Sequence, residues 1–184
     1  MMPRDDQLQA LLDKQAIAEL SYRYSRAADR LDRALLTSVY WPDGTDDHGA
    51  FAGSAPDYID WVMTLLAGWI SVHHDNTNIL IELDGDTATG EVHWTGYYTY
   101  EIDGQVHDHL AVGRYIDRYE RRAGEWRILH RTCLSDWSRL EPAVNWRTDP
   151  VRSRLAGKRK PDDLLYSARR LGIAGQPQEW GNSA

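Results

Sequence analysis

The chain has 184 residues, a formal net charge of −7 and a single cysteine, Cys133. This length suits one domain that buries roughly two-thirds of its unfolded surface. Lys and Arg are scattered along the chain, so no basic face favours nucleic acid or anionic lipid as a partner. A lone cysteine excludes an internal disulfide, and the first residues, MMPRDDQLQ, lack the apolar stretch of a signal peptide or membrane span. We therefore expect a cytoplasmic protein with neither a nucleic-acid nor a membrane partner.

The first part of the chain has the apolar spacing of helices. Apolar residues recur at three- and four-residue steps as far as residue 31 and predict helix buried along one stripe; they are Leu8, Leu11, Leu12, Ile17, Leu20, Tyr24, Ala27, Ala28 and Leu31. Within this run Asp13 is a candidate cap for a second segment, and Asp32 for a short helix that the turn Trp41-Pro42-Asp43-Gly44 ends. Ser54, followed by a proline two residues later, predicts another helix over 55–69.

The apolar period changes to two from Val72 onward, which indicates strands. Three turn signals, at 84–86, 103–105 and 123–124, divide this region into four consecutive strands near 71–83, 87–102, 106–121 and 125–136. Strands of this length imply a strongly bent sheet, and Gly90, Gly96 and Gly113 fit such bending. Helices followed by hairpins predict an α+β fold, in which N-terminal helices cover an antiparallel sheet and leave a pocket.

We place the domain at residues 1–140. Beyond Trp137 the chain is polar, with a short helical pattern from Leu164 to Leu171. Residues 141–184 are interpreted as an extension that packs on the domain or on a neighbouring subunit, with its charged residues solvated.

The aromatic composition is unusual, with eight Trp and ten Tyr but one Phe. Rings with a polar atom suit a pocket that must also form hydrogen bonds. The alternative is that these rings are ordinary core and rim residues.

The chain has seven histidines, but their spacing does not favour a metal site. His73 and His74 are neighbours on a predicted strand, so they point to opposite faces and only one can enter a pocket. His107 and His109 share a face, as in half of a cupin-like site, but no carboxylate follows at the required spacing. We therefore expect no bound metal.

General acid–base chemistry is the class that the residues favour. There is neither a Gly-x-Ser-x-Gly elbow nor a glycine-rich phosphate loop, and Cys133 lies at an apolar strand end as a small hydrophobic residue. Asp29 ends a helix on the same side as Tyr24, where a buried carboxylate needs a partner. An imidazole is the simplest partner, and a His–carboxylate pair in an apolar cavity abstracts protons near neutral pH. The alternative for Asp29 is a solvent-facing position at the helix end.

A set of motifs over residues 8–137 resembles the SnoaL-like branch of the nuclear-transport-factor-like superfamily. The motifs are Ile17-Ala-Glu-Leu, Tyr24, Asp29, Tyr40-Trp41-Pro-Asp, His74, Thr77-Asn78, Asp84-Gly-Asp-Thr-Ala, Gly113-Arg-Tyr-Ile-Asp-Arg-Tyr-Glu-Arg and Gly124-Glu-Trp-Arg-Ile. The resemblance implies a cone of curved sheet closed by helices around a cavity. This family includes scytalone dehydratase, hexachlorocyclohexane dehydrochlorinase, bacterial bile-acid dehydratases and lignin-dimer formaldehyde lyases, which share cofactor-free elimination.

The resemblance also implies a catalytic pair, in which Asp29 orients His74 and His74 is the base. The strand pattern is in conflict with this, because the apolar residues at 79, 81 and 83 share a face with His73. Either a bulge near Asn76-Thr77 resets the phase, or His73 is the inward residue. We favour His74 because of the motif spacing.

Other residues are candidates for contact with the substrate or its leaving group. Tyr24 is placed to donate a hydrogen bond to the leaving oxygen, and at most one of His130 and Arg131 faces inward. The predicted substrate contacts are Asp47, His48, His73, Trp94, Tyr98, Tyr115 and Arg131. There is no lysine near Tyr24 of the kind that the dehydrochlorinase branch uses, which argues against halide as the leaving group.

The predicted function is a cofactor-independent lyase of the dehydratase type. Its substrate would be a hydrophobic, ring-containing, hydroxylated molecule such as a steroid, a bile acid or a plant-derived aromatic. Alternatives are a formaldehyde lyase acting on lignin-derived dimers, a steroid-type isomerase, and a non-catalytic small subunit of a ring-hydroxylating dioxygenase. Because the family's open sheet faces usually pair, we expect a homo-oligomer, either a dimer or a trimer.

Overall fold

A computed structural model describes residues 3–144 and 157–168. The chain divides into two units, Met1–Val144 and Asn145–Ala184. The second contains the short helix α5 (Leu164–Ala168), and most of the expected extension lies outside the described residues. No helix in the described ranges is long and apolar enough to cross a membrane.

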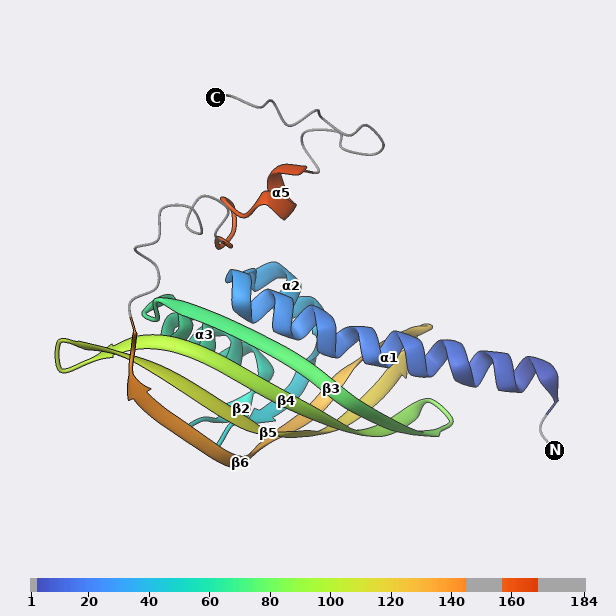
Figure 1. The fold of residues 1–184 in the computed structure, drawn as a ribbon. Helices are drawn as coiled ribbons and strands as arrows, with labels where there is room; N and C mark the ends of the chain where they lie inside the picture. Colours follow the sequence, from blue (N-terminus) through green and yellow to red (C-terminus); the bar gives the residue numbers. More distant parts are fainter. Residues whose placement is uncertain (1–2, 145–156, 169–184) are drawn as a thin grey trace, which may run out of the picture. The chain divides into compact units, whose positions relative to one another are not determined.

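The first unit is built from three helices and six strands, and its α+β class is confirmed. In chain order the elements are α1 (Arg4–Arg30), α2 (Arg33–Val39), β1 (Tyr40–Asp47), β2 (Ala52–Ser54), α3 (Ala55–Ala67), β3 (Ser71–Asp84), β4 (Thr87–Ile102), β5 (Gln105–Arg122) and β6 (Glu125–Pro142). The strand order is β2-β1-β6-β5-β4-β3. Figure 1 shows the long strands bending, with α1, α2 and α3 on the concave side of the sheet. The buried apolar side chains of these helices and of the inner sheet face form one core.

The predicted helix caps at Asp32 and Ser54 are confirmed. The Asp32 carboxylate accepts a hydrogen bond from the Leu35 amide at 3.2 Å and caps α2. The Ser54 hydroxyl accepts one from the Asp57 amide at 3.3 Å and caps α3. Such caps satisfy amides that have no partner within the helix.

The expectation that Asp13 caps a second helical segment is wrong, because α1 runs without interruption. The Asp13 carboxylate is buried and accepts hydrogen bonds from Trp126 Nε1 at 2.9 Å and from Arg121 Nη1 at 3.0 Å. Donors from the sheet therefore satisfy it. Three leucines of the expected buried stripe are exposed instead, Leu8, Leu11 and Leu12.

The segment Trp41–Gly44 is part of β1 and not the turn expected from its sequence. Tyr40 pairs with Ile128 and Thr45 with His130, so β1 uses five residue steps where β6 uses two. The extra residues form an irregular bulge, which explains the Pro-Asp-Gly signal. The predicted antiparallel pairing holds for β3 to β6, whereas the additional strand β1 runs parallel to β6.

The four long strands from β3 to β6 were predicted from the sequence, and β6 alone is markedly longer than expected. Its pairing with β5 continues from Trp137 opposite Val112 to Pro142 opposite His107. The strand therefore crosses the domain boundary that we expected at residue 140. The end of β6 is exposed and therefore polar, so the apolar alternation that predicts a strand is missing there.

A bulge in β3 resolves the conflict in the strand pattern. The pairing of β3 with β4 shifts register between Thr77 and Ile79, and Asn78 has a φ of 45°. The additional residue brings His74 onto the same face as the buried Ile81. The His74 side chain is 8% exposed and that of His73 is 57% exposed.

Candidate functional site

Asp29 in the last turn of α1 holds His74 of β3 through two hydrogen bonds. Asp29 Oδ1 lies 2.7 Å from His74 Nδ1, and Oδ2 accepts from the His74 backbone amide at 3.2 Å. Both side chains are largely buried, at 6% and 8% exposure. One carboxylate therefore fixes both the ring and the backbone of His74, and a proton on Nδ1 leaves Nε2 as the acceptor.

Tyr98 of β4 contacts this second nitrogen, with its hydroxyl 3.1 Å from His74 Nε2. Burial raises the pKa of Tyr98, and the nearby Asp29 carboxylate raises it further. The hydroxyl therefore remains protonated and can donate to His74. Gly96 lies directly opposite His74, and a Cβ at that position would collide with the Tyr98 hydroxyl and ring. Gly96 thus provides the space in which Tyr98 reaches the histidine.

Asn76 ties β3 to α1 beside this pair. Its Nδ2 donates to the Ser21 carbonyl at 2.9 Å and to Ser25 Oγ at 2.6 Å. Sequence reasoning missed this residue as part of the site, although its position two residues after His74 places both on the same face before the bulge.

The hydroxyl of Tyr24 lies in a second cluster instead of on the His74 pair. It bonds to the hydroxyl of Tyr58 from α3 and lies 3.3 Å from His48 Nε2. Burial raises the pKa of Tyr24 and of Tyr58. Tyr58 was read from the sequence only as a core residue of its helix.

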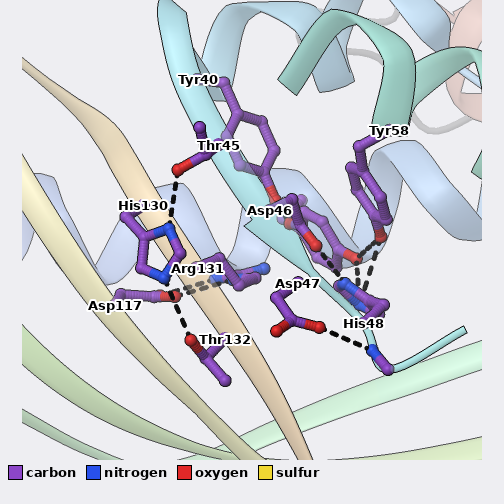
Figure 2. A network of polar contacts seen from close by, with 12 residues as sticks. Tyr40, Thr45, Asp46, Asp47, His48, Tyr58, Asp117, His130, Arg131 and Thr132 are labelled. Carbon is purple, nitrogen blue, oxygen red and sulfur yellow. Dashed lines mark hydrogen bonds and ion pairs between the residues drawn. The ribbon is translucent and has the colours of Figure 1, made fainter. Parts of the chain in front are cut away.

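Asp46 and His48, at the end of β1, form the other half of this cluster (Figure 2). The Asp46 carboxylate is fully buried, accepts from the Tyr40 hydroxyl at 2.6 Å and bonds to His48 Nδ1. Asp47 contacts the loop instead, where its carboxylate accepts from the Gly49 amide at 2.9 Å. Of the two adjacent aspartates, Asp46 points inward. Alternation along a strand requires that only one of them does so, but it does not say which.

Arg131 of β6 is fully buried beneath these groups and pairs with Asp117 of β5. Its Nε donates to Asp117 Oδ1 at 2.8 Å and its Nη2 to Oδ2 at 2.7 Å. Its guanidinium carbon lies 3.9 Å from the ring centre of Tyr115 and 4.3 Å from that of Tyr24. Burial opposes the charge, but the Asp117 carboxylate holds the pKa of Arg131 well above its usual range. Its neighbour His130 bonds to two threonine hydroxyls.

One nitrogen of this guanidinium, Nη1, takes no part in the pair with Asp117. Nη1 of Arg131 is buried and has no hydrogen-bond partner among the residues that the structure describes. A buried, charged donor without a partner is costly and points to a group that binds there.

Aromatic rings cover the inner sheet face near both histidines. Tyr115 stacks on Trp94 with ring centres 5.8 Å apart, and lies 5.5 Å from Tyr24 and 6.1 Å from His48. Gly113 makes room for the Trp94 ring, because a Cβ there would lie 2.7 Å from it. The predicted contact residues Trp94 and Tyr115 are thus inward-facing, whereas the enclosed pocket remains a prediction.

The polar groups form two similar units. In each, a buried aspartate contacts Nδ1 of a histidine and a tyrosine hydroxyl contacts Nε2. Such units move protons. Within residues 3–144 and 157–168, no three His, Cys, Asp or Glu side chains converge as a metal site would require.

The bent sheet with helices on its concave side forms a cone, and a His–Asp pair lies between the first helix and the sheet. The sequence model of the SnoaL-like domain matches residues 9–132, more than half of the chain. The chain therefore belongs to the SnoaL-like domain family.

Individual relatives agree with this assignment. Rv2910c, an uncharacterized protein of Mycobacterium tuberculosis, is 29% identical over 123 residues, which cover 65% of this chain and 82% of that protein. The structure of hexachlorocyclohexane dehydrochlorinase LinA-type3 from Novosphingobium barchaimii matches 76% of this chain and 95% of its own, with a TM-score of 0.64 and 21% identity. A proposed scytalone dehydratase from Novosphingobium aromaticivorans matches 73% and 91%, with a TM-score of 0.64 and 17% identity. At these identities the two structures show a shared fold.

Proposed function

We propose that the protein is a cofactor-independent lyase that eliminates water from a hydrophobic, ring-containing, hydroxylated substrate. His74 is the base in this proposal and Asp29 orients it. The observation that carries the proposal is the buried contact of 2.7 Å between His74 Nδ1 and Asp29 Oδ1. It directs the lone pair of Nε2 toward the inner sheet face.

In the proposed reaction Nε2 of His74 takes a proton from a carbon next to an activating group. Asp29 stabilises the imidazolium that forms, as a buried carboxylate does for a histidine base. In the structure the Tyr98 hydroxyl is hydrogen-bonded to His74 Nε2. For His74 to act as a base, this hydroxyl must move away or donate its hydrogen bond to the substrate instead. General-base catalysis of this kind contributes about 10²- to 10⁴-fold to the rate.

Arg131 is the candidate for stabilising the negative charge that develops on the substrate. Its Nη1 is an unused, buried donor, and Asp117 and two aromatic rings hold the guanidinium rigidly. A preorganised cation in a region of low dielectric stabilises a developing oxyanion strongly.

The proposed substrate class follows from the rings and from the relatives. Trp94, Tyr98 and Tyr115 present flat apolar faces with polar edges, which suit a steroid, a bile acid or a plant-derived aromatic. The names of the fold relatives, a dehydrochlorinase and a proposed scytalone dehydratase, both describe eliminations.

The experiment is a screen of hydroxysteroids, bile acids and lignin-type aromatic dimers by mass spectrometry. We expect loss of water, and loss of formaldehyde would instead identify a carbon fragment as the leaving group. His74→Ala should abolish turnover, whereas the control His93→Ala, at a partly exposed position on the neighbouring strand β4 where the ring contacts Glu91, should keep it. Full activity of a folded His74→Ala variant would refute the role of His74.

A further inference from the structure

We propose that Asp46 and His48 form a second acid–base pair, which supplies a proton to the leaving hydroxyl group through the Tyr24 hydroxyl. This inference rests on the proposed elimination and assigns its acid side. His48 acts through Tyr24, so it is a positioning residue that also relays the proton. No motif of the sequence pointed to Asp46 as a partner of His48.

The geometry repeats that of the His74 pair. His48 Nε2 lies 3.3 Å from the Tyr24 hydroxyl and 3.2 Å from that of Tyr58, and these two phenols bond to each other. Asp46 holds the opposite ring nitrogen. The His48 ring also stacks on Tyr58 with centres 4.6 Å apart, and its side chain is 16% exposed. Figure 2 shows Asp46, His48 and Tyr58 converging in this way.

The buried Asp46 carboxylate has His48 as its ion-pair partner. Asp117 is a second buried carboxylate, and Nε and Nη2 of the buried Arg131 guanidinium are both committed to it. A proton on His48 would give the buried Asp46 carboxylate a cationic partner of its own. The titratable groups that face His48 or its partners come from every neighbouring element; they are Tyr24, Tyr40, Asp46, Tyr58, Tyr115, Asp117, Arg131 and Cys133.

The phenols can pass a proton on, but they do not remain deprotonated. Burial raises the pKa of Tyr24 above its ordinary value, so a phenolate formed there must be protonated again at once. His48 Nε2 is within reach to do this. Imidazole is the side chain whose ordinary titration lies nearest neutral pH, which suits it to hold the transferable proton.

The proton balance of the reaction then closes. His74 takes the carbon-bound proton, the electron pair of that bond forms the double bond, and the carbon–oxygen bond breaks. The departing oxygen takes the proton of Tyr24 and leaves as water, and Tyr24 receives a proton from His48. His74 has then gained the proton from carbon and His48 has lost one to the departing water, and exchange with solvent restores both histidines. A hydroxyl group needs this acid, whereas a halide leaves without a proton.

The two pairs adjoin the same ring-covered face of the sheet. Tyr115 contacts both Tyr24 and His48, and its stacking partner Trp94 lies on β4 four residues from Tyr98, which contacts His74. A substrate on these rings would lie between a base and an acid.

The first test is independent of any substrate and uses histidines labelled with ¹⁵N in the full-length protein. At neutral pH we expect both ring nitrogens of His48 to be protonated, and Asp46→Asn to convert His48 to the neutral form. His130, which bonds to the hydroxyls of Thr45 and Thr132, is the internal control and should not respond. A neutral His48 in the unmodified protein would overturn the proposal.

The second test compares leaving groups, using the hydroxylated substrate found in the screen and its analogue with a halide at the same carbon. For His48→Gln and for Tyr24→Phe we expect kcat/KM to fall about 10²-fold on the hydroxylated substrate. The loss on the halide analogue should be at least about tenfold smaller, because a halide needs no acid. The alkaline limb of the pH profile, which reports the acid, should disappear in His48→Gln.

These outcomes separate the second pair from the first. Equal losses on both substrates would show that His48 only supports the structure, and would overturn the relay. His74→Ala should reduce turnover of both substrates, so retained activity in that variant would refute the proposed function whatever His48 does.

Discussion

His74 and Gly96 lie directly opposite each other on β3 and β4, and the missing side chain of Gly96 is what allows the Tyr98 hydroxyl to reach His74 Nε2. The glycine was interpreted in the sequence as a point of sheet bending. In the structure it is a point of close approach, where the ring of the residue two positions later folds back over the backbone.

Gly96→Ala should therefore displace the Tyr98 ring. Overpacking of this kind destabilises a protein by about 1–3 kcal/mol, so the midpoint of urea unfolding should fall, and the hydrogen bond to His74 should be lost. Gly68→Ala is the matched control, because a Cβ there meets nothing closer than 3.5 Å. Equal stability of the two variants would contradict the close approach at Gly96.

The ion pair between Arg131 and Asp117 should be a major determinant of stability. Asp117→Asn leaves a fully buried guanidinium without its counter-charge, and breaking a buried pair costs about 3–5 kcal/mol. Glu19→Gln is the control, because Glu19 and Arg23 are both about half exposed and such pairs contribute less than about 1 kcal/mol. Denaturant unfolding measures both, and a loss at Asp117 as small as that at Glu19 would be the contrary result.

The sequence predicted the elements that have strong periodicity and clear caps. The helix caps at Asp32 and Ser54 and the four long strands follow from local rules. The segment Trp41–Gly44 could not be assigned in this way, because its Pro-Asp-Gly signal is that of a turn, whereas pairing with β6 makes it a bulged strand. Asp13 was misread for the same kind of reason, since its partners come from the distant residues Arg121 and Trp126.

The candidate site was predictable in part. Motif spacing pointed to Asp29 and His74, and the bulge at Asn78 removed the objection from strand alternation. The cluster around His48 was not foreseen, because Tyr58 looks like any core residue of an amphipathic helix. The role of Tyr58 depends on its contacts with Tyr24 and His48, which lie far from it in the sequence and cannot be predicted from a local pattern.

Cys133 should be unreactive while the protein is folded. Burial raises the pKa of its thiol from 9.0 to about 12, and only the thiolate attacks alkylating reagents. At pH 8 the rate of reaction with iodoacetamide should be about 10³-fold lower in the folded protein than in urea, as the lower thiolate fraction requires. Rapid labelling of the folded protein would contradict the burial.

The same shift predicts how stability changes in alkali. Above pH 9 the thiol of the unfolded chain loses its proton, while the folded state keeps it up to about pH 12. The unfolded state then binds fewer protons, so the free energy of unfolding should fall as pH rises through this window. Cys133→Ala should reduce that fall, as measured by urea unfolding at pH 8 and pH 10.

The central claim is that Asp29 makes His74 a base by fixing its ring, and kcat/KM of Asp29→Asn tests it most directly. The amide keeps the size of the carboxylate but not its charge, so it can neither stabilise an imidazolium nor favour the correct tautomer. With the substrate from the screen, and with folding verified by circular dichroism, we predict a loss of at least about 10²-fold. A folded Asp29→Asn variant with unchanged kcat/KM would contradict the account.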